Sequence, residues 1–260
     1  MFEERKISPE LRKQYREKGY WKDETLLDCW DRTVEKYPDR EYVVDDRGYR
    51  YTYREMDEAA GRVASYLLWL GIRPGEVVSY QLPIWSEFAM LTIACYKIGA
   101  VAHPIAMSYE EKELARSLNV TESRCYFGPT FFYKTDYEER ILAVRDQVPL
   151  LKDVVLIDSV RERKSNVPLL REILASCEPL PKERCVHTKN GQDIAVILCT
   201  SGTTGGTKGV LLTHDNVRYS EDTFNRELGL TEEDIMFMPA PLQSRDRFPS
   251  CDHRADASWR

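Results

Sequence analysis

Close pairs of cysteine or histidine are missing from this sequence. Its seven cysteines lie far apart in the 260-residue chain, and no two of its four histidines have the spacing of metal ligands. Zinc sites and dithiol redox motifs use such pairs, so we expect neither. An odd number of scattered cysteines favours reduced thiols, as in the cytoplasm.

Two further features are absent: a surplus of positive charge and a long apolar run. The chain carries 37 basic and 43 acidic side chains, a net charge of −6, which argues against a nucleic-acid partner. Residues 1–13 are charged and lack the apolar core of a signal peptide. No stretch approaches the roughly 18 apolar residues of a membrane span. We therefore expect a cytoplasmic protein that is not an integral membrane protein.

Alternating strand and helix patterns fill the middle of the chain, and 42% of all residues are hydrophobic. The patterns predict strands at 77–82, 100–104, 124–127 and 154–157, and helices at 86–98, 110–119 and 138–147. This order predicts an α/β fold, a doubly wound and mostly parallel sheet flanked by helices on both faces.

Helix-cap signals and changes in composition divide the chain into four segments. Residues 1–24 form an N-terminal arm, with a surface helix beginning at Ser8-Pro9. A helix at 25–37, a hairpin at 42–51 and a helix begun by the capping box of Thr52 and Glu55 open a first subdomain at 25–190. After a short helix near 169–174 and a linker, residues 191–242 begin a second subdomain, and residues 243–260 form a tail of different character.

A loop rich in glycine and hydroxyl side chains lies between two strand-like segments, 194–199 and 210–212. It reads Thr200-Ser201-Gly202-Thr203-Thr204-Gly205-Gly206-Thr207-Lys208-Gly209. Its glycines let backbone N–H groups converge, and Lys208 adds a positive charge, which suits a polyphosphate. It is not a Walker A loop, since Lys208 leads into a strand. The alternative is a flexible linker, which the flanking apolar strands disfavour.

This loop resembles the phosphate-binding signature of the AMP-forming acyl-CoA synthetases, a branch of the adenylate-forming superfamily. The resemblance includes Thr213-His214-Asp215-Asn216, Gly71-Ile72-Arg73-Pro74-Gly75 and Lys97-Ile98-Gly99-Ala100-Val101. Two positions depart from the signature: Cys199 replaces a common aromatic residue, and Thr207 replaces proline.

The resemblance implies a ligase that converts a carboxylic acid, ATP and CoA into acyl-CoA through acyl-AMP. It implies that Thr200, Ser201, Gly202, Thr203, Thr204, Gly205, Lys208 and Gly209 bind ATP, with Thr204 near the Mg²⁺ carried by ATP. Residues 81–85 and 238–242 are similar to the branch that acts on short- and medium-chain fatty acids or alicyclic acids. Luciferase-like and peptide-synthetase adenylation share the same loop and remain alternatives.

Several other candidate side chains can be explained by capping, packing or burial. His214 is as well explained by capping or packing as by contact with nucleotide, and His103 by burial at the end of a strand. Trp85, Phe88, Met90 and Tyr96 could line an acyl pocket, but helical spacing between two strands favours the core.

The tail beyond Leu242 does not follow the family pattern. Codons permitted for residues 244–251, read one base forward, can spell the family's His-Ala-Thr-Gly-Phe, which suggests a reading-frame error that the coding DNA would test. By resemblance, the adenine-site Glu, the ribose-site Asp and the catalytic Lys would follow later, so we expect an incomplete, inactive fragment with no catalytic residue. The alternatives are a non-catalytic nucleotide-binding module and a non-functional truncation product.

Overall fold

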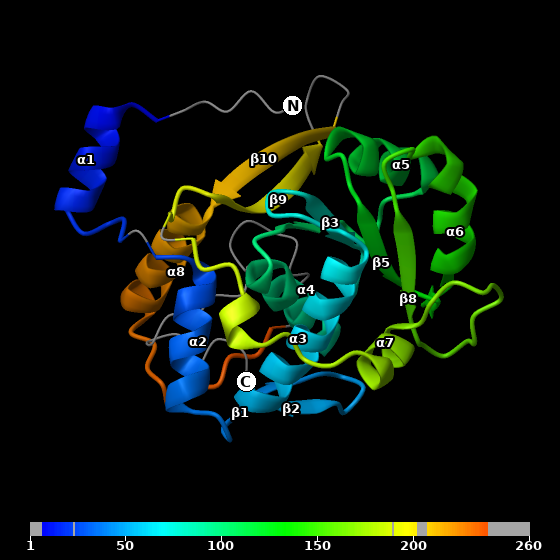
Figure 1. Cartoon of the computed structure of the whole chain (residues 1–260), viewed down its shortest axis with the longest axis horizontal. Helices are drawn as coiled ribbons and strands as arrows, with labels where there is room; N and C mark the ends of the chain where they lie inside the picture. The colour runs from blue at the N-terminus through cyan, green and yellow to red at the C-terminus, as the bar shows by residue number, and fades with distance from the viewer. Residues whose placement is uncertain (1–6, 23, 189, 202–206, 239–260) are drawn as a thin grey trace.

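A six-stranded sheet forms the centre of the molecule in the computed structural model, which describes residues 7–22, 24–188, 190–201 and 207–238 (Figure 1). The strand order is β10-β9-β4-β3-β5-β8. Neighbouring strands from β9 to β8 are parallel, and β10 is an antiparallel edge strand. The bounds are β3 (Val77–Tyr80), β4 (Val101–Pro104), β5 (Cys125–Pro129), β8 (Asp153–Ile157), β9 (Ile194–Ser201) and β10 (Thr207–Thr213).

Helices cover both faces of this sheet, as the alternating pattern predicted (Figure 1). One face packs on α2 (Leu26–Lys36), α3 (Tyr53–Trp69), α4 (Ser86–Lys97) and α7 (Leu170–Ser176), and the other on α5 (Glu111–Val120) and α6 (Tyr137–Val144). Successive strand residues point to opposite faces, so Val78 and Tyr80 join the larger core while Tyr126 joins the smaller one. The fold class predicted from the sequence is confirmed.

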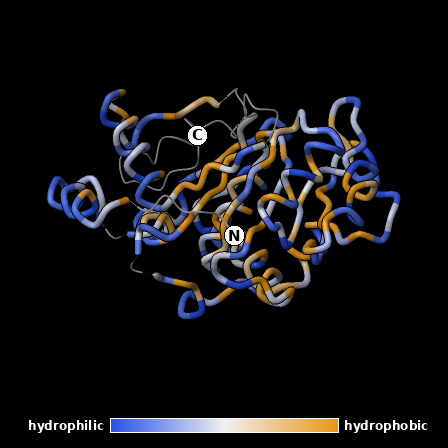
Figure 2. Tube along the Cα trace, turned by 90° about the horizontal axis from the view of Figure 1, so that it is seen from above, coloured by the Kyte–Doolittle hydropathy of each residue, from blue (hydrophilic) through white to orange (hydrophobic). Residues whose placement is uncertain are grey.

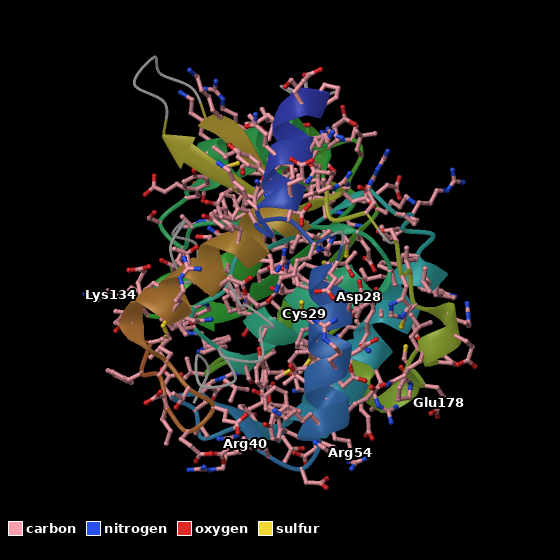
Figure 3. All side chains as sticks on the ribbon, turned by 90° about the vertical axis from the view of Figure 1, so that its left-hand side faces the viewer. Asp28, Cys29, Arg40, Arg54, Lys134 and Glu178 are labelled. Carbon is pink, nitrogen blue, oxygen red and sulfur yellow. The ribbon has the colours of Figure 1, made fainter. Side chains whose placement is uncertain are left out.

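The N-terminal region follows its cap signals. The predicted surface helix is α1 (Pro9–Glu17), capped by Ser8 and with no buried residue. The predicted hairpin is β1 (Glu41–Val44) with β2 (Arg50–Thr52), and the capping box of Thr52 and Glu55 begins α3. Arg54, in the first turn of α3, pairs with Asp39 at 3.1 Å (Figure 3). Cys29 on α2 is buried.

Small elements complete the described chain. A short hairpin of β6 (Phe131–Phe132) and β7 (Thr135–Asp136) and two 3-10 helices, η1 (Arg145–Gln147) and η2 (Lys182–Arg184), were not predicted. Figure 2 shows the apolar segments gathered along the interior strands and the polar segments at the periphery. No described helix is long and apolar enough to cross a membrane.

The segments on either side of residue 190 share the central sheet. Ala102 of β4 pairs with Val196 of β9, so β9 and β10 extend the sheet built by earlier residues. The subdomain division predicted at this point stays a prediction. The predicted tail at 243–260 lies outside the described residues.

Candidate functional site: the β9–β10 hairpin

The predicted phosphate-binding segment is carried by an antiparallel hairpin. The register pairs Thr207 with Ser201, Lys208 with Thr200 and Gly209 with Cys199. Four further residue pairs continue the ladder, and the last pair, at its base, is Thr213 with Ile194. The strand that follows the loop, in place of a helix, agrees with the exclusion of a Walker A loop.

Four of the predicted ATP-binding residues lie at the loop end of this hairpin: Thr200, Ser201, Lys208 and Gly209. Lys208 is exposed, and among the described parts of the chain no ion pair involves it. Gly202, Thr203, Thr204 and Gly205 fall outside the described residues, and the ATP-binding roles of all eight residues stay predictions. An exposed ammonium beside the end of a hairpin fits a phosphate group, which would supply the missing counter-charge.

The hairpin leaves the sheet at an edge suited to ligands. β9 runs parallel to β3, β4 and β5, so its carboxyl end and the loop after it lie at the edge where those strands also end. In open α/β sheets, ligands bind at this edge. α4 begins at the same edge, directly after β3 and Pro83.

A buried polar cluster lies beneath the end of β9. His103 on β4 is fully buried, with Nδ1 at 2.7 Å from the Ser79 hydroxyl and Nε2 at 3.3 Å from the Cys199 sulfur. Ser117 on α5 also contacts Nε2, at 3.2 Å. Burial lowers the pKa of His103 to about 3, so the ring is neutral at physiological pH. Sequence reasoning placed His103 in a strand but missed its link to Cys199, which only the pairing of β4 with β9 brings about.

His214 has a structural role in this fold. Its Nδ1 accepts a hydrogen bond of 3.1 Å from the Leu26 backbone N–H, and its ring lies against Tyr96 with centroids 5.6 Å apart. Burial lowers its pKa to about 4. Packing between the starts of α8 (His214–Leu228) and α2, one of the two readings left open by the sequence, is therefore what the described residues show.

Its neighbours in the Thr-His-Asp-Asn segment anchor the same helix. Thr213 and Asn216 form a capping box at the start of α8. Asp215 is fully buried, its backbone N–H donates to the Gly191 carbonyl, and its carboxylate accepts from Gln192 Nε2 at 2.7 Å. This part of the motif fixes α8 after the hairpin.

The four apolar and aromatic side chains weighed as an acyl pocket belong to the core, as predicted. Phe88 and Met90 are fully buried, Tyr96 is 2% exposed and Trp85 is 6% exposed, and all four join the larger hydrophobic cluster. The Arg47 guanidinium lies 4.0 Å from the Trp85 ring centroid and pairs with Asp45 and Glu87, which closes this end of the core from solvent.

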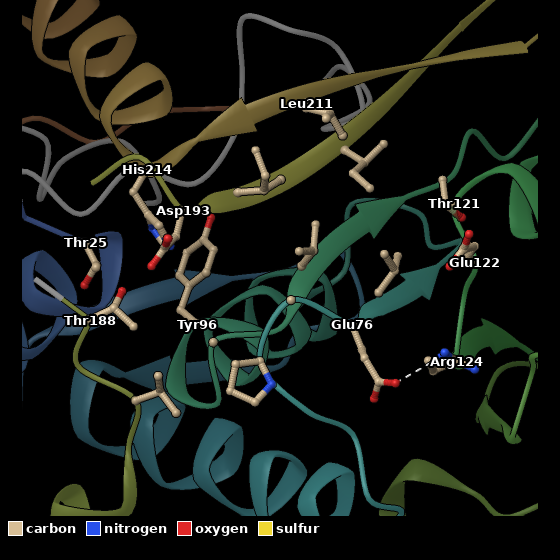
Figure 4. A pocket seen from close by; sticks show the side chains of 18 residues that line it. Thr25, Glu76, Tyr96, Thr121, Glu122, Arg124, Thr188, Asp193, Leu211 and His214 are labelled. Carbon is tan, nitrogen blue, oxygen red and sulfur yellow. Dashed lines mark ion pairs between the residues drawn. The ribbon is translucent and has the colours of Figure 1, made fainter. Parts of the chain in front are cut away.

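A cavity of about 540 Å³ opens at the opposite edge of the sheet (Figure 4). Its apolar floor is formed by Val77, Val101 and Ile197 with Ile194 and Leu211, and its two ends carry the Glu76–Arg124 ion pair and the His214–Asp193 region. Of the predicted phosphate-binding residues that the structure describes, none lines this cavity, because the loop end of the hairpin lies away from the amino ends of β3 and β4.

No group of three or more His, Cys, Asp or Glu side chains that could hold a metal occurs within residues 7–22, 24–188, 190–201 and 207–238. The six cysteines in those ranges are free thiols. The described end of the hairpin offers a lysine ammonium and strand backbone groups, and the Mg²⁺ expected near Thr204 stays a prediction.

A known protein family matches the part of the chain that contains the hairpin and the sheet. The pattern of the family described as AMP-binding enzyme matches residues 30–243. The chain therefore belongs to the AMP-binding enzyme family. The match covers the sheet, the hairpin and α8.

Curated relatives are about twice as long as this chain or longer. The medium-chain fatty-acid–CoA ligase of Escherichia coli (strain K12) is 39% identical over 236 residues, which cover 91% of this chain and 41% of that protein. The 2,3-dihydroxybenzoate-AMP ligase of Bacillus subtilis (strain 168) is 28% identical over 81% of this chain and 37% of that protein. This chain thus spans about two fifths of their length.

Solved structures share the fold. The apo structure of Mycobacterium smegmatis MbtA aligns with a TM-score of 0.82 at 23% identity, over 97% of this chain and 46% of that one. The inhibitor-bound N-terminal domain of FACL13 from Mycobacterium tuberculosis aligns with a TM-score of 0.72 at 25% identity, over 85% of this chain and 52% of that one. Both alignments cover part of a larger structure.

Proposed function

We propose that this chain supplies the ATP phosphate-binding part of an acid–CoA ligase that acts on a short- or medium-chain fatty acid or an alicyclic acid. The observation that carries the proposal is the exposed Lys208 at the end of a hairpin that leaves the carboxyl edge of the sheet. The 39% identity with the Escherichia coli medium-chain fatty-acid–CoA ligase supports the substrate class.

In this proposal the substrate carboxylate attacks the α-phosphorus of ATP, acyl-AMP and pyrophosphate form, and CoA then displaces AMP. Lys208 pairs with the β- and γ-phosphates and neutralises charge that develops on the leaving pyrophosphate. Mg²⁺, when bound, neutralises the same oxygens. Thr200, Ser201 and Gly209, together with the predicted residues 202–205, complete the phosphate contacts. A cytoplasmic location is part of the proposal, since ATP and CoA are available there.

The first experiment measures Mg-ATP binding to the 260-residue chain by calorimetry. Lys208→Ala should weaken binding about tenfold or more, because a charge-assisted hydrogen bond contributes about 1.5–3 kcal/mol. Lys208→Arg should retain most of the affinity. The control is Lys134→Ala, which removes a lysine from the turn between β6 and β7 (Figure 3). Equal affinity for all four proteins would contradict a phosphate site at the hairpin.

A second experiment tests whether this chain alone forms acyl-AMP. Acid-dependent exchange of labelled pyrophosphate into ATP, measured with octanoate and cyclohexanecarboxylate, reports acyl-AMP formation. A non-catalytic nucleotide-binding module predicts ATP binding without exchange, which is also what an incomplete ligase predicts for this chain alone. Exchange by the chain alone would overturn the expectation of inactivity.

A further inference from the structure

We propose that His103 is a positioning residue that holds the end of β9 in place through Cys199 and thereby sets the position of Lys208. The inference rests on the proposed function, because it assigns His103 a task in the same phosphate site. His103 does not itself reach the hairpin end, so its effect passes through Cys199 and the β9–β10 ladder.

The backbone alone holds β9 weakly to its parallel neighbour. The ladder between β4 and β9 has one residue pair, Ala102 with Val196, in the described strands. Toward the loop, the link between these strands is made by side chains: the Cys199 sulfur lies 3.3 Å from His103 Nε2 and 3.5 Å from the Ser117 hydroxyl. Three elements, β4, α5 and β9, therefore meet at the imidazole.

His103 is well suited to act as a fixed point. Its side chain is fully buried, and its Nδ1 lies 2.7 Å from the Ser79 hydroxyl and 3.3 Å from the Thr121 hydroxyl. Ser79 also contacts Ser123, so the ring is held from the strand side by β3 and by the segment that precedes β5. A buried polar network whose members are all satisfied is rigid, and leaving one member unpaired is costly.

The path from Cys199 to the phosphate site is short. Cys199 stands opposite Gly209, and the next pair of the ladder is Thr200 with Lys208. A displacement of Cys199 therefore moves the backbone that carries Lys208. Small misplacements of a positioned charge reduce binding and catalysis strongly, because a charge-assisted contact depends on distance and direction.

The test compares Cys199→Ala, Cys199→Ser and His103→Asn in the 260-residue chain, with Cys125→Ala as the matched control. Cys125 on β5 is more deeply buried than the half-buried Cys199, and its side chain faces the opposite core. Cys199→Ser keeps a polar atom for His103, whereas alanine does not. His103→Asn keeps a polar group near Ser79 but is too short to reach Cys199. Amide hydrogen exchange and Mg-ATP affinity are measured for each protein.

Cys199→Ala and His103→Asn should raise exchange in residues 194–201 and 207–213 and weaken Mg-ATP binding about three- to tenfold, as expected for one lost, partly buried hydrogen bond. Cys199→Ser should restore both values to within about twofold of the parent chain. The double variant, Cys199→Ala with His103→Asn, should show the same exchange and the same Mg-ATP affinity as His103→Asn alone, because both changes remove the same contact.

Two results would overturn the inference: exchange in the hairpin of Cys199→Ala equal to that of Cys125→Ala, or exchange raised evenly over β3, β5 and β8, which indicates a general loss of stability. If the parent chain fails to bind Mg-ATP, the proposed phosphate site is wrong for this chain. The exchange comparison then still decides whether His103 positions the hairpin.

Discussion

The Lys97 ammonium lies 2.7 Å from the Asp57 carboxylate, and the same carboxylate oxygen accepts a hydrogen bond of 2.7 Å from the Trp30 indole. The lysine side chain is 2% exposed and that of Asp57 is 18% exposed. One carboxylate on α3 therefore joins α4 and α2 beneath the sheet.

This arrangement predicts that Asp57→Ala destabilises the chain more than Lys97→Met does. Removing the carboxylate leaves a buried ammonium without its partner, at a cost of about 3 kcal/mol, whereas methionine fills the space with an apolar group. Urea unfolding monitored by fluorescence measures the free energy of unfolding of both variants. Combining the two changes should cost less than Asp57→Ala alone, and a strictly additive double variant would contradict a direct pair.

The buried histidines predict a loss of stability at mildly acidic pH. The pKa is lowered from 6.5 to about 3 in His103 and to about 4 in His214, in both cases by burial. The unfolded chain therefore binds more protons below pH 6.5, so stability is fully present above pH 6.5 and falls as the pH decreases toward the folded pKa values. Between pH 6.5 and 5 each histidine should cost about 2 kcal/mol.

Urea unfolding at pH 7.5, 6.5, 5.5 and 5.0 measures this slope. His214→Asn removes one titrating group, so the slope between pH 6.5 and 5 should decrease by close to one proton, although the variant is less stable at pH 7.5 because the Leu26 contact changes. An unchanged slope would show that His214 is not the neutral, buried acceptor described above.

The close approach of Gly191 to Asp215 predicts sensitivity to a single methyl group. A Cβ at residue 191 would lie 2.5 Å from the Asp215 carboxyl carbon, and that carboxylate is fully buried. Gly191→Ala should therefore destabilise the chain by about 1–3 kcal/mol, as overpacking does. Gly48→Ala is a control for substitution without crowding, since nothing lies within 4 Å there, although its φ of 84° adds backbone strain. Thermal unfolding compares the two, and a smaller loss for Gly191→Ala would contradict the crowding.

The cap of α3 gives a prediction of smaller size. Thr52 accepts from the Glu55 N–H at 3.2 Å, and Glu55 accepts from the Thr52 N–H at 2.8 Å. Thr52→Ala should lower the free energy of unfolding by about 1 kcal/mol, while Thr52→Ser, which keeps the hydroxyl, should change it by a few tenths. A loss of equal size in both variants would point to packing of the threonine methyl group in place of capping.

The sequence alone determined the order and type of the main elements. Alternating apolar segments, the capping box at Thr52 and the strand-like 194–199 are local signals, and each acts through the backbone of its own segment. The small hairpin of β6 and β7 escaped prediction because its two-residue strands carry no period. Glycine, threonine and lysine at this spacing also predict a phosphate-binding loop, and that role stays a prediction.

Tertiary structure decided what the isolated residues could not. His103 meets Cys199 across 96 positions of sequence because β9 inserts beside β4, and His214 meets Leu26 across 188 positions because α8 returns to α2. No local pattern encodes such contacts: they arise when buried polar groups must find partners after the apolar faces of the sheet have packed. The sequence therefore predicts a phosphate-binding loop, while the pairing of β9 with β4, and with it the position of Lys208 on β10, depends on the fold.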